Sequence, residues 1–261
     1  MSGPVTIGFF DSGVGGLSVL RHALDALGGI TLLYVADSAH APYGARAPQE
    51  VLQRCRAITA FLIEQGATAI VVACNTATAI AVERLRAEFT IPIVAMEPAI
   101  KPASRLTRSG KVAVLATQGT LSSDRYARLR ADHGRYIDVH ERICQHWVEA
   151  VEEGDLDSPR VYDLLNAELS PLHRLGVDTY VLGCTHYPFL VPTIRAVVGD
   201  QVSLVDPGPA VIAQLARRLG LVASGAQRSP VRLFSSGPPA VLEGLAARLI
   251  DLHADCRALP F

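Results

Sequence analysis

Short apolar runs alternate with longer amphipathic stretches along the whole chain. The short runs have the length and the β-branched content of buried strands. We predict strands at residues 5–10, 31–36, 69–73, 91–95, 112–116, 136–139, 180–183, 202–205 and 231–234. Between them apolar residues recur every three to four positions, as amphipathic helices require, for example at Leu17, Leu20, Leu24 and Leu27. Strands and helices that take turns indicate parallel sheets with helices on both faces, which is the α/β class.

The chain's length and an internal similarity indicate two domains. At roughly 150 residues per domain, 261 residues suit two modest α/β domains. One predicted strand leads into Cys74 and a later one into Cys184, and hydrogen-bonding residues follow each cysteine. We therefore predict two doubly wound parallel-sheet domains, one from residues 1–96 with the returning segment 208–261 and one from residues 97–207. Pro171 and Pro192 each interrupt a helical pattern and are predicted to break or kink it.

Composition favours a folded protein that binds neither nucleic acid nor a membrane. Apolar residues make up 49% of the chain and charged residues 19%, which is enough to build a core and too little charge for disorder. The 24 basic and 25 acidic residues nearly cancel, and no basic run offers a nucleic-acid groove. The longest uncharged stretch, residues 65–82, is short for a bilayer span, and no basic and apolar leader opens the chain. We expect a soluble protein of the cytoplasm.

Cysteine and lysine usage limits the possible cofactors. The five cysteines are an odd number spread over a long chain, which fits reduced thiols better than a disulfide framework. Lysine occurs only at Lys101 and Lys111, so an enzyme that uses pyridoxal phosphate would have to form its Schiff base there. Lys101 precedes a proline and Lys111 opens an apolar strand, and neither position favours that role.

Polar motifs follow several of the predicted strands. In open parallel sheets, ligands gather outside the carboxyl ends of the strands. The motifs found there are Asp11-Ser12-Gly13-Val14-Gly15-Gly16, Asp37 with Pro42-Tyr43-Gly44, Cys74-Asn75-Thr76, Thr117-Gln118-Gly119-Thr120 and Cys184-Thr185-His186. These segments are the candidates for a site.

Each motif also has a purely structural interpretation. The glycine turn after Asp11 lacks the G-x-G-x-x-G spacing, and the chain has no P-loop sequence, so a nucleotide-phosphate loop has little support. A lone cysteine after an apolar strand is commonly a small core residue, but the polar neighbours of Cys74 and Cys184 favour functional thiols. Cys184 with His186 resembles half of a metal site without the usual zinc spacing, so we expect no metal. The structural interpretation suits the other cysteines, Cys55, Cys144 and Cys256.

Four ordered motifs give the chain a family resemblance. They are FDSGVGG at Phe10, APYG at Ala41, ACNTATA at Ala73 and GCTHYPFL at Gly183. The sequence resembles the glutamate racemases of the aspartate/glutamate racemase family over nearly its full length. The resemblance implies two domains related by pseudo-twofold symmetry, with an active site in the cleft between them. It also implies cofactor-independent interconversion of L-glutamate and D-glutamate for peptidoglycan synthesis, in a protein that is often a homodimer.

The resemblance also assigns residues to roles. Cys74 and Cys184 match the paired proton donor and acceptor. The other matches to catalytic positions are Asp11, Asp37, Glu152 and His186. The matches to substrate-binding positions are Asp11, Ser12, Tyr43, Gly44, Asn75, Thr76, Thr117, Thr120, Thr185 and His186. The segment Cys144-Gln145-His146-Trp147 departs from the family's usual C-P-x-F before Glu152.

The chemistry of racemisation fits two thiols. A base is needed on one face of the α-carbon and an acid on the other, and the roles must exchange when the other enantiomer reacts. A free thiol has a pKa of about 8.5, so one thiol can be tuned towards thiolate while its partner keeps a proton. Hydrogen bonds to the α-carboxylate must stabilise the carbanion-like state, and Asn75, Thr76 and Thr185 are candidates for this.

Three other functions remain open from the sequence alone. An aspartate or hydantoin racemase shares this type of fold and uses paired cysteines. A thiol hydrolase would use Cys184 with a histidine base and would leave Cys74 without a role. A two-lobed amino-acid sensor would bind its ligand without removing the α-hydrogen.

Overall fold

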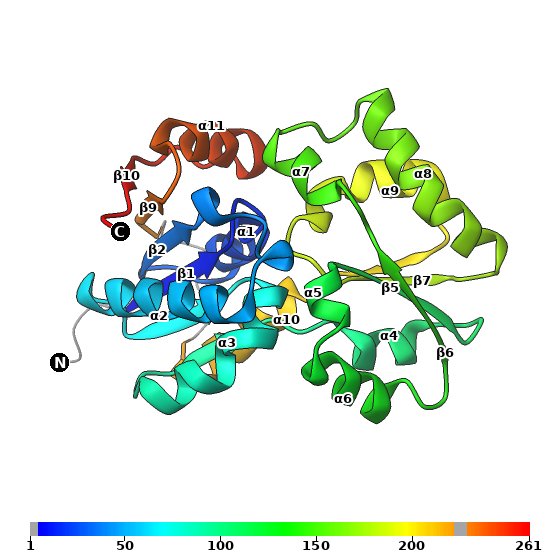
Figure 1. Ribbon diagram of the computed structural model, residues 1–261, viewed down its shortest axis with the longest axis horizontal. Coiled ribbons are helices and arrows are strands. Elements are labelled where there is room, and N and C mark those ends of the chain that lie inside the picture. Colours follow the sequence, from blue (N-terminus) through cyan, green and yellow to red (C-terminus); the bar gives the residue numbers. More distant parts are fainter. Residues whose placement is uncertain (1–4, 222–228) are drawn as a thin grey trace. The chain divides into compact units, whose positions relative to one another are not determined.

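The described part of the chain forms two compact units, each with one parallel sheet. The computed structural model describes residues 5–221 and 229–261 (Figure 1). The first unit is drawn from Met1–Met96 and Gly208–Phe261, and the second is Glu97–Pro207. Every strand pairing in both sheets is parallel, which confirms the α/β class. Among the described residues, no helix is long and apolar enough to cross a membrane.

The first unit has a six-stranded sheet in the order β10-β9-β2-β1-β3-β4. Its strands are β1 (Thr6–Asp11), β2 (Thr31–Ala36), β3 (Ala69–Val72), β4 (Ile93–Ala95), β9 (Val231–Ser235) and β10 (Cys256–Ala258). Its helices are α1 (Leu17–Ala26), α2 (Pro48–Glu64), α3 (Asn75–Glu88), α10 (Gly208–Leu219) and α11 (Pro239–Ile250), with the 3₁₀ turns η1 (Ser38–His40) and η2 (Tyr43–Ala45). Helix α2 packs against α3, and α1 packs against α10 and α11.

The second unit has a four-stranded sheet in the order β6-β5-β7-β8. Its strands are β5 (Lys111–Ala116), β6 (Asp138–Ile143), β7 (Thr179–Leu182) and β8 (Ser203–Val205). Its helices are α4 (Ile100–Leu106), α5 (Gln118–Leu121), α6 (Asp124–His133), α7 (Trp147–Glu152), α8 (Pro159–Arg174) and α9 (Val191–Val198), with the 3₁₀ turn η3 (Tyr187–Leu190).

The two sheets share one topology. The order β2-β1-β3-β4 in the first unit repeats as β6-β5-β7-β8 in the second, and β9 and β10 extend the first sheet beyond β2. In register, Phe10 of β1 lies beside Val72 of β3, and Leu115 of β5 lies beside Leu182 of β7. Cys74 and Cys184 each come two residues after the equivalent strand. Each thiol therefore occupies the same topological position in its own unit.

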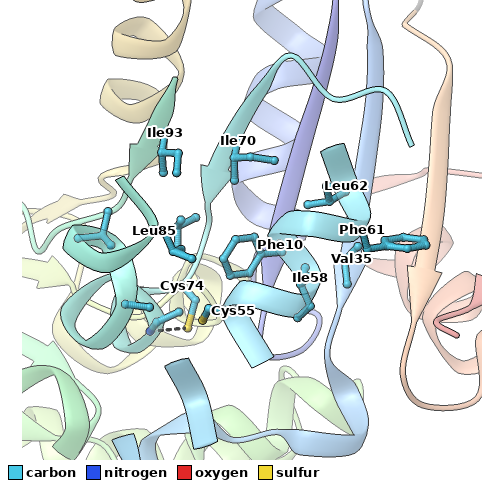
Figure 2. Packing of buried hydrophobic residues seen from close by; sticks show 14 of the residues in the cluster. Phe10, Val35, Cys55, Ile58, Phe61, Leu62, Ile70, Cys74, Leu85 and Ile93 are labelled. Atoms are coloured by element: carbon cyan, nitrogen blue, oxygen red, sulfur yellow. Dashed lines mark hydrogen bonds between the residues drawn. The ribbon is translucent and has the colours of Figure 1, made fainter. Parts of the chain in front are cut away.

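An apolar core holds the strand ends of the first unit in place. Phe10, Ile58 and Ile70 are fully buried in one cluster with side chains from β3, α2 and α3. Figure 2 shows that Cys55 and Cys74 belong to this cluster, so the sulfur of Cys74 lies at the edge of packed apolar side chains. Burial of each large apolar side chain contributes roughly 1.5–3 kcal/mol, which fixes the backbone that carries the polar loop residues.

Four local features differ from the sequence-based predictions. The strand predicted at residues 136–139 lies later in the chain, as β6 (Asp138–Ile143). Its charged and partly exposed side chains do not form the apolar run that predicts a buried strand. Pro171 does not break α8, which continues for three residues beyond it to Arg174. Pro192 lies in the first turn of α9, where a missing N–H breaks no hydrogen bond. Strand β10 was not predicted, since it has three residues and two of them are exposed.

We predict that Gly183→Ala destabilises the protein by about 1–3 kcal/mol. Gly183 follows β7, and a β-carbon there would lie 2.7 Å from the Leu115 carbonyl oxygen, a backbone atom that does not yield easily. Urea unfolding measures the effect as a lower midpoint. The matched control is Gly244→Ala in α11, where an added β-carbon meets nothing within 4 Å and helix propensity improves. A Gly183→Ala midpoint equal to wild type contradicts the prediction.

Candidate active site

The loop after β1 is held tightly around Asp11. Asp11 is fully buried, and its Oδ1 accepts hydrogen bonds from the Ser12 backbone N–H at 2.6 Å and the Ser12 hydroxyl at 3.2 Å. The Tyr34 hydroxyl donates to the carbonyl of Gly13 at 2.7 Å. A β-carbon at Gly16 would lie 2.8 Å from the Asp11 β-carbon, so this close approach requires glycine. The loop thus presents a fixed carboxylate and hydroxyl at the end of the strand.

Cys74 caps the N-terminus of α3. Its sulfur accepts a hydrogen bond from the Ala77 N–H at 3.5 Å, drawn in Figure 2, and lies 3.8 Å from the Ser12 hydroxyl oxygen. The first turn of a helix stabilises negative charge, because its N–H groups and its dipole both point there. Cys74 is 5% exposed, so its sulfur lies inside the protein rather than on the surface. The structure thus places Asp11, Ser12 and Cys74 next to one another.

The two residues after Cys74 begin α3 and are also buried. Both polar atoms of the Asn75 amide are buried and have no hydrogen-bond partner among the described residues. A buried amide without a protein partner is costly, so its hydrogen-bonding atoms are suited to a bound polar molecule. Thr76 follows, 4% exposed. This helix start is therefore suited to hold a polar molecule.

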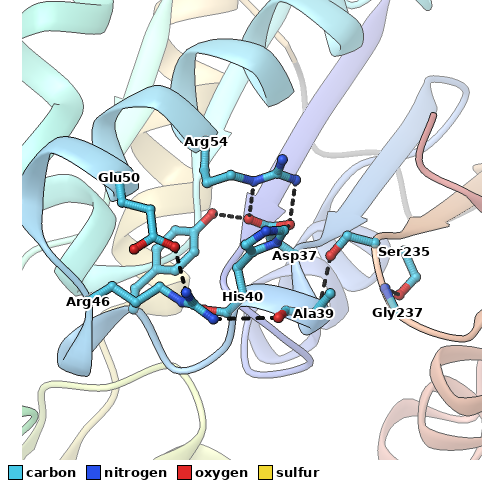
Figure 3. Close-up of polar contacts among 10 residues, drawn as sticks. Asp37, Ala39, His40, Arg46, Glu50, Arg54, Ser235 and Gly237 are labelled. Carbon is cyan, nitrogen blue, oxygen red and sulfur yellow. Dashed lines mark hydrogen bonds and ion pairs between the residues drawn. The ribbon is translucent and has the colours of Figure 1, made fainter. Parts of the chain in front are cut away.

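Asp37 lies in a dense polar network (Figure 3). Its Oδ2 accepts from the Tyr43 hydroxyl at 2.6 Å and from Arg54 Nε at 2.9 Å, and its Oδ1 accepts from Arg54 Nη2 at 2.7 Å. His40 Nδ1 lies 3.0 Å from the same Oδ1. Burial raises the pKa of Asp37, but the hydrogen bonds from Arg54 and Tyr43 outweigh it and lower the pKa overall. Asp37 is therefore a charged anchor for Tyr43.

Sequence reasoning did not identify Arg54. A signal was present, because Arg54 lies between Val51 and Ile58 in the three-to-four spacing of the buried face of α2. A charged residue in such a position needs a buried partner, and Asp37 is that partner. The other expected member of this region, Gly44, lies in η2 directly after Tyr43.

In the second unit Cys184 begins a chain of three polar side chains. Its sulfur lies 3.6 Å from His186 Nδ1, and His186 Nε2 lies 2.7 Å from Glu152 Oε1. Burial lowers the pKa of His186, but its contacts with Cys184 and Glu152 outweigh burial and raise the pKa well above the usual value. The arrangement favours an imidazolium beside the sulfur.

Helix α7 carries Glu152 to His186, and the divergent segment before it sets the position of α7. Trp147 is fully buried and meets the Tyr187 ring edge-on at 5.0 Å between centroids. His146 caps the helix in the left-handed region, at φ 64°, which costs a residue with a side chain roughly 1 kcal/mol. Because Tyr187 follows His186 directly, this packing ties both partners of the ion pair to one core.

Three threonines are the remaining candidate site residues, and two further cysteines are buried in the cores. Thr117 and Thr120 share a hydrogen bond of 3.1 Å between their hydroxyl oxygens at the start of α5, and Thr185 is buried next to Cys184. Burial raises the pKa of Cys55 and Cys144 and therefore keeps both as neutral thiols. Cys74 after β3 and Cys184 after β7 are thus buried thiols with polar neighbours, and the two strands are equivalent in their units.

The fold defines an α/β protein in which the equivalent strand of each unit leads into a buried cysteine. A family model described as Asp/Glu/Hydantoin racemase matches residues 14–231. Among curated relatives, the glutamate racemase of Pseudomonas aeruginosa is 47% identical over 241 residues, which is 91% of each chain. That of Methylococcus capsulatus is 48% identical over 90% of this chain and 88% of the relative. The chain belongs to the Asp/Glu/hydantoin racemase family.

Solved structures agree with this family. Glutamate racemase isoform RacE1 from Bacillus anthracis superposes with a TM-score of 0.88 at 30% identity, covering 100% of this chain and 99% of that one. The Escherichia coli glutamate racemase, solved with L-glutamate and the activator UDP-MurNAc-ala, superposes with a TM-score of 0.85 at 31% identity and covers 98% of both chains.

We predict that Glu152→Gln lowers the pKa of His186, because the substitution keeps the shape and removes the charge. The folded state raises this pKa, so the interaction stabilises the fold fully below the unfolded value of about 6.5 and loses its effect as pH rises through the raised value. Glu152→Gln should therefore destabilise the fold more at pH 6 than at pH 9. Histidine NMR titration and urea unfolding at both pH values measure the two effects.

The matched control for this prediction is Glu153→Gln. Glu153 is the next residue and pairs with Arg160, but both side chains are more than half exposed, so the pair contributes little. Glu153→Gln should therefore lower the free energy of unfolding only slightly at both pH values. Equal pH dependence in the two variants would contradict the assigned role of Glu152.

Proposed function

We propose that this protein interconverts L-glutamate and D-glutamate without a cofactor, with Cys74 and Cys184 as the two acid–base groups. One observation carries the proposal: each unit holds a buried, hydrogen-bonded thiol two residues after the equivalent strand. The relatives named glutamate racemase, at 47% and 48% identity over about nine tenths of the chain, support glutamate as the substrate.

The proposed reaction needs the two sulfurs on opposite faces of one α-carbon. One thiolate removes the α-hydrogen as a proton, and the opposite thiol gives its proton to the other face of the carbon. The product is the opposite enantiomer, and the two sulfurs have exchanged their protonation states. The return reaction, or a proton exchange with solvent, restores the enzyme. Atoms and charge balance without any other reactant, since one proton leaves the carbon and one arrives.

The α-carbon is a very weak acid, so the negative charge that develops must be stabilised. Asn75, Thr76 and Thr185 are assigned to the α-carboxylate, and the unpartnered amide of Asn75 supports this assignment. Hydrogen bonds placed in advance around a developing anion are usually the largest single contribution to catalysis. The buried carboxylate of Asp11 is assigned to the substrate's ammonium group, with Thr117 and Thr120 as further binding residues.

Recognition of the substrate's side chain is assigned to the loop around Ser12 and to the turn η2. The Ser12 hydroxyl and the N–H of Gly44 are assigned to the side-chain carboxylate of glutamate. Tyr43 contributes differently, because its hydroxyl has one proton and donates it to Asp37. Its ring then fixes the turn that precedes Gly44.

The two thiols would be tuned by different groups. The imidazolium of His186, held by Glu152, would stabilise the thiolate of Cys184, and the start of α3 would do the same for Cys74. Asp37 matches a position expected to assist the acid–base chemistry; here we assign it to holding the turn before Gly44, through its hydrogen bond from Tyr43. The product, D-glutamate, would serve peptidoglycan synthesis in the cytoplasm of a bacterium.

We predict that Cys74→Ser and Cys184→Ser each reduce racemisation by roughly 10²–10⁴-fold, because a hydroxyl is a far weaker acid than a thiol. Circular dichroism follows the reaction from either enantiomer. Cys256→Ser, which alters a partly exposed cysteine on β10, is the matched control and should keep wild-type turnover. Near-normal turnover in either site variant would contradict the two-thiol mechanism.

The same assay separates the alternatives. Faster turnover of L-aspartate than of L-glutamate would make the protein an aspartate racemase. Glutamate binding by calorimetry without turnover would make it a sensor. Covalent trapping of Cys184 by an acyl or amide substrate would favour a thiol hydrolase.

A further inference from the structure

The carboxylate of Asp37 is already saturated by groups of the protein. Its side chain is fully buried, and its two oxygens receive two contacts from Arg54, one from Tyr43 and one from His40. An ionised carboxylate has about four acceptor positions, so these contacts use its capacity. Asp37 therefore has its effect through the groups that it holds.

The most consequential of those groups is the Tyr43 hydroxyl. Tyr43 is 1% exposed and lies in the apolar cluster that contains Cys74. The 3₁₀ turn η2, which Tyr43 begins, contacts α3, the helix capped by Cys74. The hydrogen bond to Asp37 is the polar anchor of this ring, so the place of η2 against α3 depends on it.

Arg54 is the cation that makes this anchor possible. Both of its contacts to Asp37 are short and parallel, the bidentate geometry that fixes a carboxylate in angle as well as in distance. Its guanidinium carbon also lies over the Phe261 ring, 5.2 Å from the ring centre. Without Arg54, a fully buried carboxylate would lose its principal counter-charge, which is strongly unfavourable.

We propose that Arg54 is a positioning residue for recognition of the glutamate side chain, because it holds Asp37 and through it the Tyr43 turn. This inference rests on the proposed function. The contacts that the described residues give Arg54 are with Asp37 and the Phe261 ring, so we expect its effect to fall on substrate binding rather than on proton transfer. A purely structural role would instead lower stability without a selective change in KM.

The test is steady-state kinetics on wild type, Arg54→Ala, Arg54→Lys, Tyr43→Phe and the double variant Arg54→Ala/Tyr43→Phe. We expect Arg54→Ala to raise KM for glutamate about tenfold and to change kcat less than about threefold. Arg54→Lys keeps the charge but loses the bidentate geometry, so its KM should lie between those of wild type and Arg54→Ala. The double variant should be no worse than the more affected single variant, because both substitutions break one pathway.

Two controls make the result specific. Arg56→Ala removes another bidentate arginine of the same helix, but its partner Glu88 is on the surface, so kinetics should stay at wild-type values. Added guanidinium ion at non-denaturing concentration should lower the KM of Arg54→Ala and leave that of Tyr43→Phe unchanged.

The outcomes separate this inference from the function itself. Wild-type turnover of glutamate together with an unchanged KM in Arg54→Ala overturns the role of Arg54 alone. So does a double variant whose KM increase is the product of the two single increases. A wild-type protein that does not racemise glutamate overturns both the function and this inference. If Arg54→Ala fails to fold, the KM of Arg54→Lys decides: a wild-type value overturns the proposal and a raised value supports it.

Discussion

A parallel sheet brings the ends of neighbouring strands to one edge, and the candidate site depends on this constraint. In the first unit β1 and β3 are paired, so the loops that follow them are neighbours, and Ser12 comes within 3.8 Å of the Cys74 sulfur. The pairing of β5 with β7 repeats the arrangement in the second unit. The apolar core beneath the strand ends keeps these polar groups buried, where each hydrogen bond and charge has a larger effect than in water.

The two cysteines lie at equivalent positions but have different hydrogen-bonding surroundings. Cys74 receives an N–H at the start of a helix, whereas Cys184 has a histidine held by a glutamate. In the proposed reaction the two thiols exchange roles when the other enantiomer reacts, but they need not have the same surroundings. The difference in surroundings gives each thiol its own means of stabilising negative charge. Repeated strand order with distinct local chemistry is what a shared topology permits.

Much of the fold could be predicted from the hydrophobic pattern, because buried strands such as Ala69–Val72 are short, uninterrupted apolar runs. The cysteine loops were predictable because polar residues follow those strands directly. The missed features depend on tertiary partners. Strand β10 exists only because β9 lies beside it, and the spacing that places Arg54 on the buried face of α2 does not reveal that Asp37 is its partner. The assignment of Glu152 rested on the resemblance alone, since the segment before it departs from the family pattern, and its contact with His186 was not predicted.

The central claim is that two different groups handle the proton on the two faces of the α-carbon. The most direct measurement is the isotope content of both enantiomers early in a reaction of L-glutamate in deuterium oxide, read by NMR or mass spectrometry. The account predicts that the first D-glutamate formed carries deuterium at the α-carbon while the remaining L-glutamate still carries hydrogen. D-glutamate that retains the original hydrogen would mean that one group removes and returns the same proton, and would contradict the account.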